Sequence, residues 1–287
     1  MQNHHKLTSL AISLGISFSL LSCAPVSVTT ETNESKLQGK LTLTGSSSVA
    51  PLANEIAKRF EAENPEVRID VQTGGSSRGL ADAKQGLADI GMVSRALKEE
   101  ENQQLKGFAI ARDGIGIIVH ADNPISSLTD EQVLQIYTGE INNWQEVGGV
   151  DAAITVVNKA EGRSTLELFL KYFQLNNSQV KADVIIGDNQ QGLKTIAGNG
   201  NSIGYVSIGA AEYDITEGIP IKILPVGGVE ATTQTVQNGS FPLSRPLTLV
   251  TKKEPKGLSK EFIDFARSPA VHDLVEEQNL VPLEVEN

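Results

Sequence analysis

Short runs rich in β-branched residues alternate along the chain with stretches whose apolar residues recur every three to four positions. The first pattern predicts strands and the second predicts amphipathic helices. The predicted strands are 40–45, 67–73, 88–94, 108–122, 153–159, 184–189, 202–208, 221–228 and 247–252. The predicted helices are 49–63, 78–86, 98–105, 129–139, 164–173, 190–199, 259–267 and 270–279. This alternation is typical of open α/β sheets with helices packed on their faces.

Two extended apolar segments, 114–122 (GIGIIVHAD) and 246–252 (PLTLVTK), are long enough to pass from one lobe of a protein to another. If they pair as neighbouring strands, the chain leaves a first lobe near residue 116 and returns to it near residue 241. We therefore expect two α/β lobes, 40–115 plus 241–287 and 116–240. A two-strand hinge would join them, with a cleft between.

The N-terminal segment has a short polar head, an apolar run from Leu10 to Leu21, and then Ser22 and Cys23. The run is too short for a membrane span and predicts a secretory signal peptide over residues 1–22. Residues 20–23 resemble a bacterial lipoprotein cleavage box, which implies a lipid on Cys23. Residues 23–39 lack apolar periodicity and predict a flexible tether. We expect an exported protein, lipid-anchored to a membrane at its periplasmic or extracytoplasmic face.

Composition narrows the possible functions. The formal net charge of −11 argues against nucleic acid as a partner, because that partner requires a basic surface. Cys23 is the single cysteine, so no intramolecular disulfide can form. After the signal peptide no histidine pair or cysteine cluster has ligand spacing, and we expect neither a metal nor a cofactor.

Three predicted strand-to-helix junctions share one chemistry: 44–52 (TGSSSVAPL), 73–80 (TGGSSRGL) and 158–166 (NKAEGRSTL). In each, glycine is followed by hydroxyl residues where an amphipathic helix begins. A helix start exposes unpaired N–H groups and the positive end of a dipole, which suits an anion. Serine and threonine are also ordinary helix caps, so one junction alone is weak evidence for an anion site. Three together predict a donor-lined pocket for one small oxyanion.

Dipoles alone are too weak for such a site, because each contributes only about 0.3–1 kcal/mol. Charge-assisted hydrogen bonds must supply most of the binding, and a guanidinium is well suited because it donates two parallel bonds. Arg163, inside the third junction, is the first candidate. Arg95 and Arg78 come next.

Seven motifs give the chain a family resemblance. In order they are TGSSSVAPL, TGGSSRGL, ADIGMVSRALKEEE, IARDGIGIIV, QIYTGEINNWQEVGG, IGYVSIGAA and FPLSRPLTLVTK. Together they resemble the phosphate-binding proteins of bacterial ABC phosphate transporters over nearly all of 40–283. The resemblance implies a type II periplasmic binding protein fold: two α/β domains joined by a double-crossover hinge, with phosphate in the cleft. It also implies delivery of phosphate to permease subunits of an ABC transporter.

The resemblance implies specific phosphate-binding residues. They are Ser47, Ser48, Ser76, Ser77, Ser94, Arg95, Arg163, Ser164 and Thr165. Many relatives have an aspartate where Ser94 stands, and that aspartate accepts the proton of phosphate. The acceptor here remains open among Glu161, Asp89 and a backbone carbonyl. Lys159 stands where relatives have a ligating arginine. We expect Arg163 to supply the guanidinium instead, and Lys159 to offset the charge of Glu161.

Two alternatives remain. The same donors suit another oxyanion, such as arsenate, sulfate or molybdate. A serine hydrolase is a different class of function, since GSSRG fits the G-x-S-x-G pattern, with Ser77 as nucleophile and Asp264 and His272 as partners. Only His120 and His272 lie outside the signal peptide, and both have structural interpretations. We therefore expect a monomeric binding protein and no enzyme.

Overall fold

The computed structural model describes residues 36–284. The predicted signal peptide, Cys23 and most of the predicted tether lie outside the described residues. The described residues form one compact unit. Within the described residues, no helix is both long enough and apolar enough to cross a membrane.

The observed elements follow the predicted alternation. The strands are β1 (Gln38–Gly45), β2 (Glu66–Thr73), β3 (Ile90–Val93), β4 (Lys106–His120), β5 (Thr155–Lys159), β6 (Val184–Ile186), β7 (Ser202–Ser207), β8 (Ile221–Leu224) and β9 (Ser244–Thr251). The α-helices are α1 (Ala50–Glu63), α2 (Ser76–Gln85), α3 (Glu99–Asn102), α4 (Asp130–Thr138), α5 (Ser164–Tyr172), α6 (Asn189–Ala197), α7 (Ile208–Thr216), α8 (Thr233–Gln237), α9 (Leu258–Ala266) and α10 (His272–Glu277). Short 3-10 helices are η1 (Trp144–Val147), η2 (Asn177–Gln179) and η3 (Pro269–Val271).

Several elements differ from the prediction, and β6 and β8 are shorter than the predicted strands 184–189 and 221–228. β1 begins at Gln38, inside the predicted tether, because Gln38 and Gly39 pair with β2. α3 has four residues instead of the predicted eight. α7 and α8 were not predicted. α7 starts directly where β7 ends, so the apolar run of the strand continues into the helix and hides its start.

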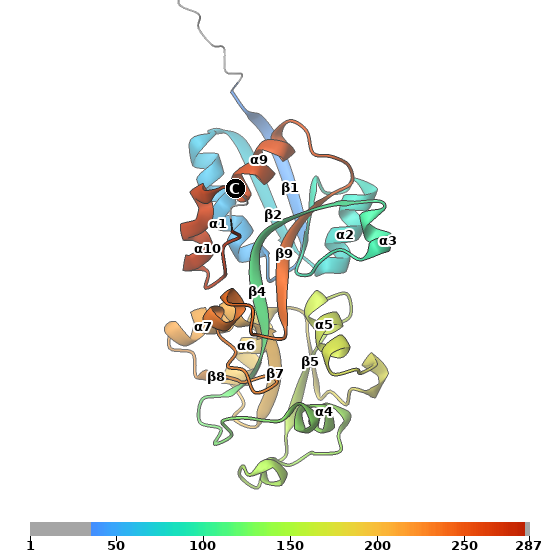
Figure 1. Ribbon diagram of the computed structural model, residues 1–287, viewed down its shortest axis with the longest axis vertical. Coiled ribbons are helices and arrows are strands. Elements are labelled where there is room, and N and C mark those ends of the chain that lie inside the picture. Colours follow the sequence, from blue (N-terminus) through green and yellow to red (C-terminus); the bar gives the residue numbers. More distant parts are fainter. Residues whose placement is uncertain (1–35, 285–287) are drawn as a thin grey trace, which may run out of the picture. The chain divides into compact units, whose positions relative to one another are not determined.

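The strands form one sheet in the order β2-β1-β3-β9-β4-β7-β5-β6, with β8 also paired to β4. β1 pairs in parallel with β2 and β3, and β5 pairs in parallel with β6 and β7. β9 is antiparallel to β3 and β4. In Figure 1, β4 and β9 run side by side through the middle, with α1, α9 and α10 around one end and α4–α7 around the other. The predicted α/β alternation is confirmed.

β4 and β9 are neighbours, as predicted for the two extended segments, but the paired residues differ. Lys106–Gly114 pairs with Ser244–Thr251, whereas most of the predicted segment 114–122 pairs elsewhere. Residues 115–119 of β4 pair with β7, and 117–120 pair with β8. β4 is therefore one long strand in two parts: the first part pairs with β9, and the second pairs with β7 and β8.

Two hydrophobic clusters lie along these strands. One contains Ala111 and Leu247 together with apolar side chains of β1, α1 and α9. The other contains Ile115 and Leu243 with side chains of α4, α5 and β7. Between the clusters, Asp113 of β4 lies opposite Arg245 of β9 in the register. A buried pair of opposite charges therefore marks the place where both strands pass from one cluster to the other.

Candidate functional site

The three predicted junctions meet around one narrow cavity. Gly45 at the end of β1 is level with Thr73 of β2 and Met92 of β3, so the segments that follow these strands start side by side. Lys159 at the end of β5 is likewise level with Ile186 of β6. The cavity lining is Ser46, Ser47, Ser48, Gly75, Ser76, Ser94, Lys159, Arg163, Ser164, Thr165 and Gly187. The starts of α1, α2 and α5 all contribute to it.

The hydroxyl groups of the cavity are arranged as donors. Ser46 Oγ accepts a hydrogen bond from Ser48 N at 3.2 Å, and Ser76 Oγ accepts one from Ser94 N at 3.3 Å. Ser48 Oγ accepts two bonds, from Asn189 Nδ2 at 3.1 Å and Arg245 Nη2 at 3.0 Å. A hydroxyl whose lone pairs are occupied can still donate its own proton. The lining therefore presents O–H groups to a bound anion.

Ser164, the first residue of α5, has a buried hydroxyl without a hydrogen-bond partner in the described part of the chain. The residue is buried, and its Oγ has no hydrogen-bond partner within residues 36–284. A buried hydroxyl without a partner is costly, and native proteins rarely keep one unless a ligand or water supplies the bond. An oxyanion in the cavity would satisfy Ser164 Oγ.

Arg245, which was not among the predicted site residues, places a guanidinium behind the cavity lining. Its Nη1 donates to Thr165 Oγ1 at 2.8 Å and to Ser94 Oγ at 3.3 Å. Its Nη2 donates to Ser48 Oγ at 3.0 Å. These hydroxyls come from three different segments of the chain, and all of them line the cavity. Arg245 therefore lies directly behind the hydroxyl lining and connects its parts.

Asp113 holds this guanidinium in place. Asp113 Oδ2 accepts from Arg245 Nη2 at 2.8 Å and from Nε at 3.2 Å, and both side chains are 1% exposed. Gly209 N at the start of α7 donates to Asp113 Oδ1 at 3.4 Å. Together with the three hydroxyl bonds, these contacts occupy the five N–H groups of the arginine. Because the pair is buried and two N–H groups donate to one carboxylate oxygen, the orientation of the guanidinium behind the cavity is fixed.

Lys159 lines the cavity and does not offset Glu161, contrary to the prediction. Its Nζ donates to Asp188 O at 2.9 Å and to Asn189 Oδ1 at 3.0 Å. Glu161 is exposed and accepts instead from Asn177 Nδ2 at 3.1 Å. Burial, helped by the positive charge of Arg245, lowers the pKa of Lys159 to about 7.

Arg163 also lines the cavity, and backbone carbonyls accept from two of its five N–H donors. Nη1 donates to Gly74 O at 2.7 Å, and Nε donates to Gly187 O. Arg163 thereby ties the second junction to the end of β6. Its role as the guanidinium that binds the ligand stays a prediction, and Arg163 is the arginine that lines the cavity.

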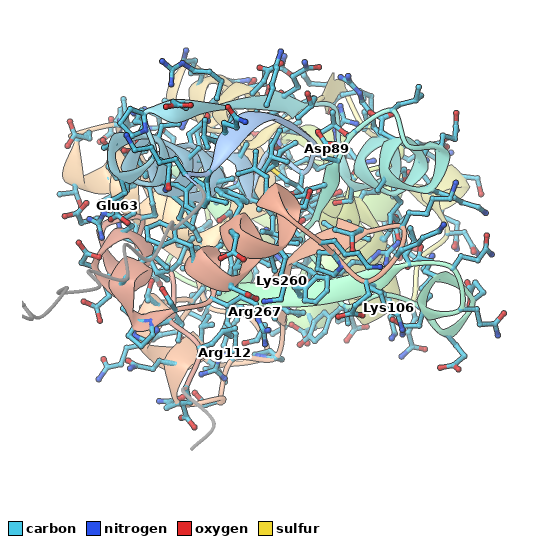
Figure 2. The ribbon with its side chains drawn as sticks, turned by 90° about the horizontal axis from the view of Figure 1, so that it is seen from above. Glu63, Asp89, Lys106, Arg112, Lys260 and Arg267 are labelled. Carbon is cyan, nitrogen blue, oxygen red and sulfur yellow. The ribbon has the colours of Figure 1, made fainter. Side chains whose placement is uncertain are left out.

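Arg95, Ser77 and Asp89 lie outside the cavity. The guanidinium of Arg95 bonds to Glu101 at 2.7 Å and Glu167 at 3.0 Å, because α3 places a carboxylate beside it. Ser77 is exposed, since a helix turns by about 100° per residue and only Ser76 can face inward. Asp89 is exposed at the surface, where it accepts from Thr42 N at 2.8 Å (Figure 2).

The hydrolase alternative finds no support in these contacts. Asp264 forms an ion pair with Lys260 rather than with a histidine. No hydrogen bond within residues 36–284 joins Ser77 to His272 or His272 to Asp264. Arg78, the third arginine candidate, bonds to Asp82, Gln72 and Thr73 O.

Comparisons with known proteins agree on one family. A family model described as "PBP superfamily domain" matches residues 30–270. The phosphate-binding protein PstS of Bacillus subtilis is 31% identical over 254 residues, which cover 87% of this chain and 83% of that protein. PstS of Borreliella burgdorferi is 30% identical over 83% of this chain and 88% of that protein.

Solved structures give the same picture. A putative phosphate ABC transporter substrate-binding protein from Clostridium perfringens, solved with bound phosphate, has a TM-score of 0.80 and 36% identity. The match covers 86% of this chain and all of that chain. An ABC-type phosphate transport receptor from Vibrio cholerae has a TM-score of 0.70 and 30% identity, over 85% of this chain and all of the other.

Proposed function

This chain belongs to the PBP superfamily and, within it, to the PstS phosphate-binding proteins, and from that premise we propose that it captures inorganic phosphate for an ABC transporter. The type II periplasmic binding protein fold predicted from the sequence is confirmed by its structural neighbours. The transporter imports the ion after the loaded receptor docks on its permease subunits.

One observation carries the proposal. Hydroxyls and helix starts from separate segments line one cavity, and a buried arginine lies behind them. No carboxylate side chain is part of that lining. A small tetrahedral oxyanion needs many converging donors, and this lining supplies them. The negative charge of the whole protein makes such local donors necessary.

We further propose that the two hydrophobic clusters are the cores of the two predicted lobes, 40–115 plus 241–287 and 116–240, which close on phosphate about β4 and β9. Several contacts join the two groups of elements across the cavity. Arg245 donates to Thr165, and Arg95 of the β3–α3 connection bonds to Glu167 of α5. Phosphate would favour this closed arrangement because only there do both groups donate to it.

The chain acts by binding alone in this proposal, and no covalent step is assigned. Calorimetric titration of residues 24–287 tests it against phosphate, arsenate, sulfate and molybdate. We expect one phosphate per chain, bound more tightly than sulfate. Absence of phosphate binding, or tighter binding of another of these anions, would contradict the proposal.

The unpartnered hydroxyl gives a sharper prediction. Ser164→Ala should weaken phosphate binding by roughly tenfold, since a hydrogen bond to a charged group contributes about 1.5 kcal/mol or more. The variant without ligand should be at least as stable as the wild type, because the buried hydroxyl lacks a partner within the described part of the chain. Titration calorimetry and thermal unfolding measure the two effects.

Thr44→Val is the matched control for Ser164→Ala. Thr44 Oγ1 is the other buried side-chain oxygen without a partner in the described region, and Thr44 does not line the cavity. Its replacement by an isosteric apolar residue should leave phosphate affinity unchanged. An affinity loss of the same size in both variants would mean that Ser164 acts on the fold instead of the ligand.

We also propose export by the signal peptide 1–22, a lipid on Cys23, and a monomeric receptor at the extracytoplasmic face. These features lie outside the described residues and rest on the sequence. Cells fed a labelled fatty acid should label the wild type and retain it in the membrane fraction. Cys23→Ala should be unlabelled and soluble, and label in that variant would contradict the anchor.

A further inference from the structure

The hydroxyl of Ser48 has a hydrogen-bonding pattern that leaves it one role toward a ligand. Its oxygen accepts from Asn189 Nδ2 at 3.1 Å and from Arg245 Nη2 at 3.0 Å. A hydroxyl has two lone pairs and one proton, so both of its acceptor positions are occupied. None of the hydrogen bonds within residues 36–284 uses the proton. Because Ser48 is buried and lines the cavity, that proton is free to be donated to an oxygen of a bound anion.

The amide of Asn189 can take only one orientation beside this hydroxyl. Lys159 Nζ donates to Asn189 Oδ1 at 3.0 Å. An ammonium group has donors and no acceptor, and an anion bound nearby keeps the lysine charged. The carbonyl oxygen of the amide must therefore face Lys159, which turns the NH2 group to Ser48. A flipped amide would place N–H groups against the ammonium and lose the bond to the lysine.

The start of α6 holds Asn189 in this position. Asp188 is the N-cap of the helix, and its carboxylate accepts from Gln191 N at 2.8 Å. Asn189 is the first helical residue and is buried. Its partner Ser48 is 141 positions away in the sequence, directly before α1. The bond therefore joins the predicted lobe 116–240 to the predicted lobe 40–115 plus 241–287.

We propose that Asn189 is a positioning residue that keeps the hydroxyl of Ser48 turned toward phosphate, an inference that rests on the proposed function. Asn189 is not among the residues that line the phosphate cavity, so it acts through Ser48. Lys159 donates to Asn189 and Asn189 donates to Ser48, and both bonds have the same direction, toward the anion. Aligned hydrogen bonds polarise one another, so the amide passes the positive polarity of a buried lysine to the hydroxyl.

Asn189→Asp reverses the polarity of the contact with almost no change in shape. The carboxylate cannot donate, so Ser48 would donate to it and turn its proton away from phosphate, while Lys159 keeps an acceptor. We expect phosphate affinity to fall at least about 100-fold, of which about tenfold is the lost hydrogen bond to the anion and the rest is charge repulsion. In a Ser48→Ala background only the repulsion remains, so Asn189→Asp should cost about tenfold less there. Titration calorimetry on the four proteins measures both losses.

Asn189→Leu removes the donor without adding a charge, and it provides a second variant if Asn189→Asp misfolds. Phosphate affinity should fall by about tenfold when Ser48 is present and by less than about twofold in the Ser48→Ala background. Gln190→Leu is the matched control. It removes the neighbouring amide of α6, which is exposed and donates to Asp214 Oδ1 at 3.3 Å, and it should leave phosphate affinity unchanged.

The outcomes separate this inference from the proposed function. A loss of equal size with and without the Ser48 hydroxyl, in either folded variant, would mean that Asn189 acts on the fold or through charge alone. Wild-type affinity in Asn189→Leu would also overturn the assignment, and in both cases the phosphate receptor stands. If phosphate does not bind the wild type, the proposed function falls and this inference falls with it.

Discussion

Arg245→Met should lower phosphate affinity by at least about 100-fold. The side chain donates to Thr165, Ser94 and Ser48, which line the cavity, and it thereby holds three hydroxyls in position to donate to the anion. Hydrogen bonds to charged groups contribute about 1.5–3 kcal/mol each, and every 1.4 kcal/mol is tenfold in affinity. Without the guanidinium these hydroxyls are no longer held in place, and the loss of two of their bonds to the anion is enough for the expected effect. Titration calorimetry measures it directly.

The single variant also leaves Asp113 buried without its partner, which costs about 3–5 kcal/mol of stability. The double variant Arg245→Met with Asp113→Asn removes that stranded charge. It should recover most of the lost melting temperature and none of the lost phosphate affinity. If the double variant binds phosphate as the wild type does, Arg245 is only a structural brace between β4 and β9.

The convergence of the three junctions could be predicted because it depends on strand ends and helix starts. Parallel strands bring their carboxyl ends to one edge of a sheet, so glycine and serine segments after β1 and β2 had to be neighbours. The alternation of strands and helices is a local property of the sequence, and it could therefore be predicted. Lys159 was placed near the site by resemblance, but its contacts with Asp188 and Asn189 depend on how α6 packs.

Arg245 was missed although the sequence contains a signal for it. Asp113 lies within the predicted strand 108–122 and Arg245 directly precedes the predicted segment 246–252, and the extended segments 114–122 and 246–252 were predicted to be neighbours. Opposite charges in adjacent buried strands are expected to pair. Which residues face each other could not be derived, because the register shifts between Ala109 and Ala111. A shift of one residue moves a side chain to the other face of the sheet.

Arg95 was predicted as a site residue, but the structure places it outside the cavity. Its place directly after Ser94 suggested a ligand, yet consecutive residues of an extended segment point to opposite sides. Ser94 faces the cavity, whereas Arg95 turns to Glu101 and Glu167. The partners of Arg95 come from α3 and α5, and the second of these is distant in sequence. Only the packed structure brings that carboxylate within reach.

Gly75 lines the cavity at a position where one added methyl group should damage the site. It caps α2 with φ 94° and ψ 159°, a conformation that only glycine adopts readily, and other residues there cost about 1–3 kcal/mol. A Cβ atom at Gly75 would lie 2.3 Å from Arg163 Nη1 and 2.8 Å from Gly162 O. The carbonyl belongs to the backbone and can move only with the third junction. Arg163 would have to leave its bonds to Gly74 O and Gly187 O.

We therefore expect Gly75→Ala to lower the free energy of unfolding by more than about 2 kcal/mol, because backbone strain and a steric clash add together. Phosphate affinity should fall more than tenfold, since the second and third junctions can no longer approach each other.

Gly86→Ala at the other end of α2 is the matched control: φ is 76° and nothing lies within 4 Å of an added Cβ. It carries only the left-handed cost of about 1–2 kcal/mol, and its phosphate affinity should equal that of the wild type. Urea unfolding measures the free energy of unfolding of the two variants, and calorimetry measures their phosphate affinity. Equal phosphate affinity in both would show that the contact between these junctions is not needed for binding.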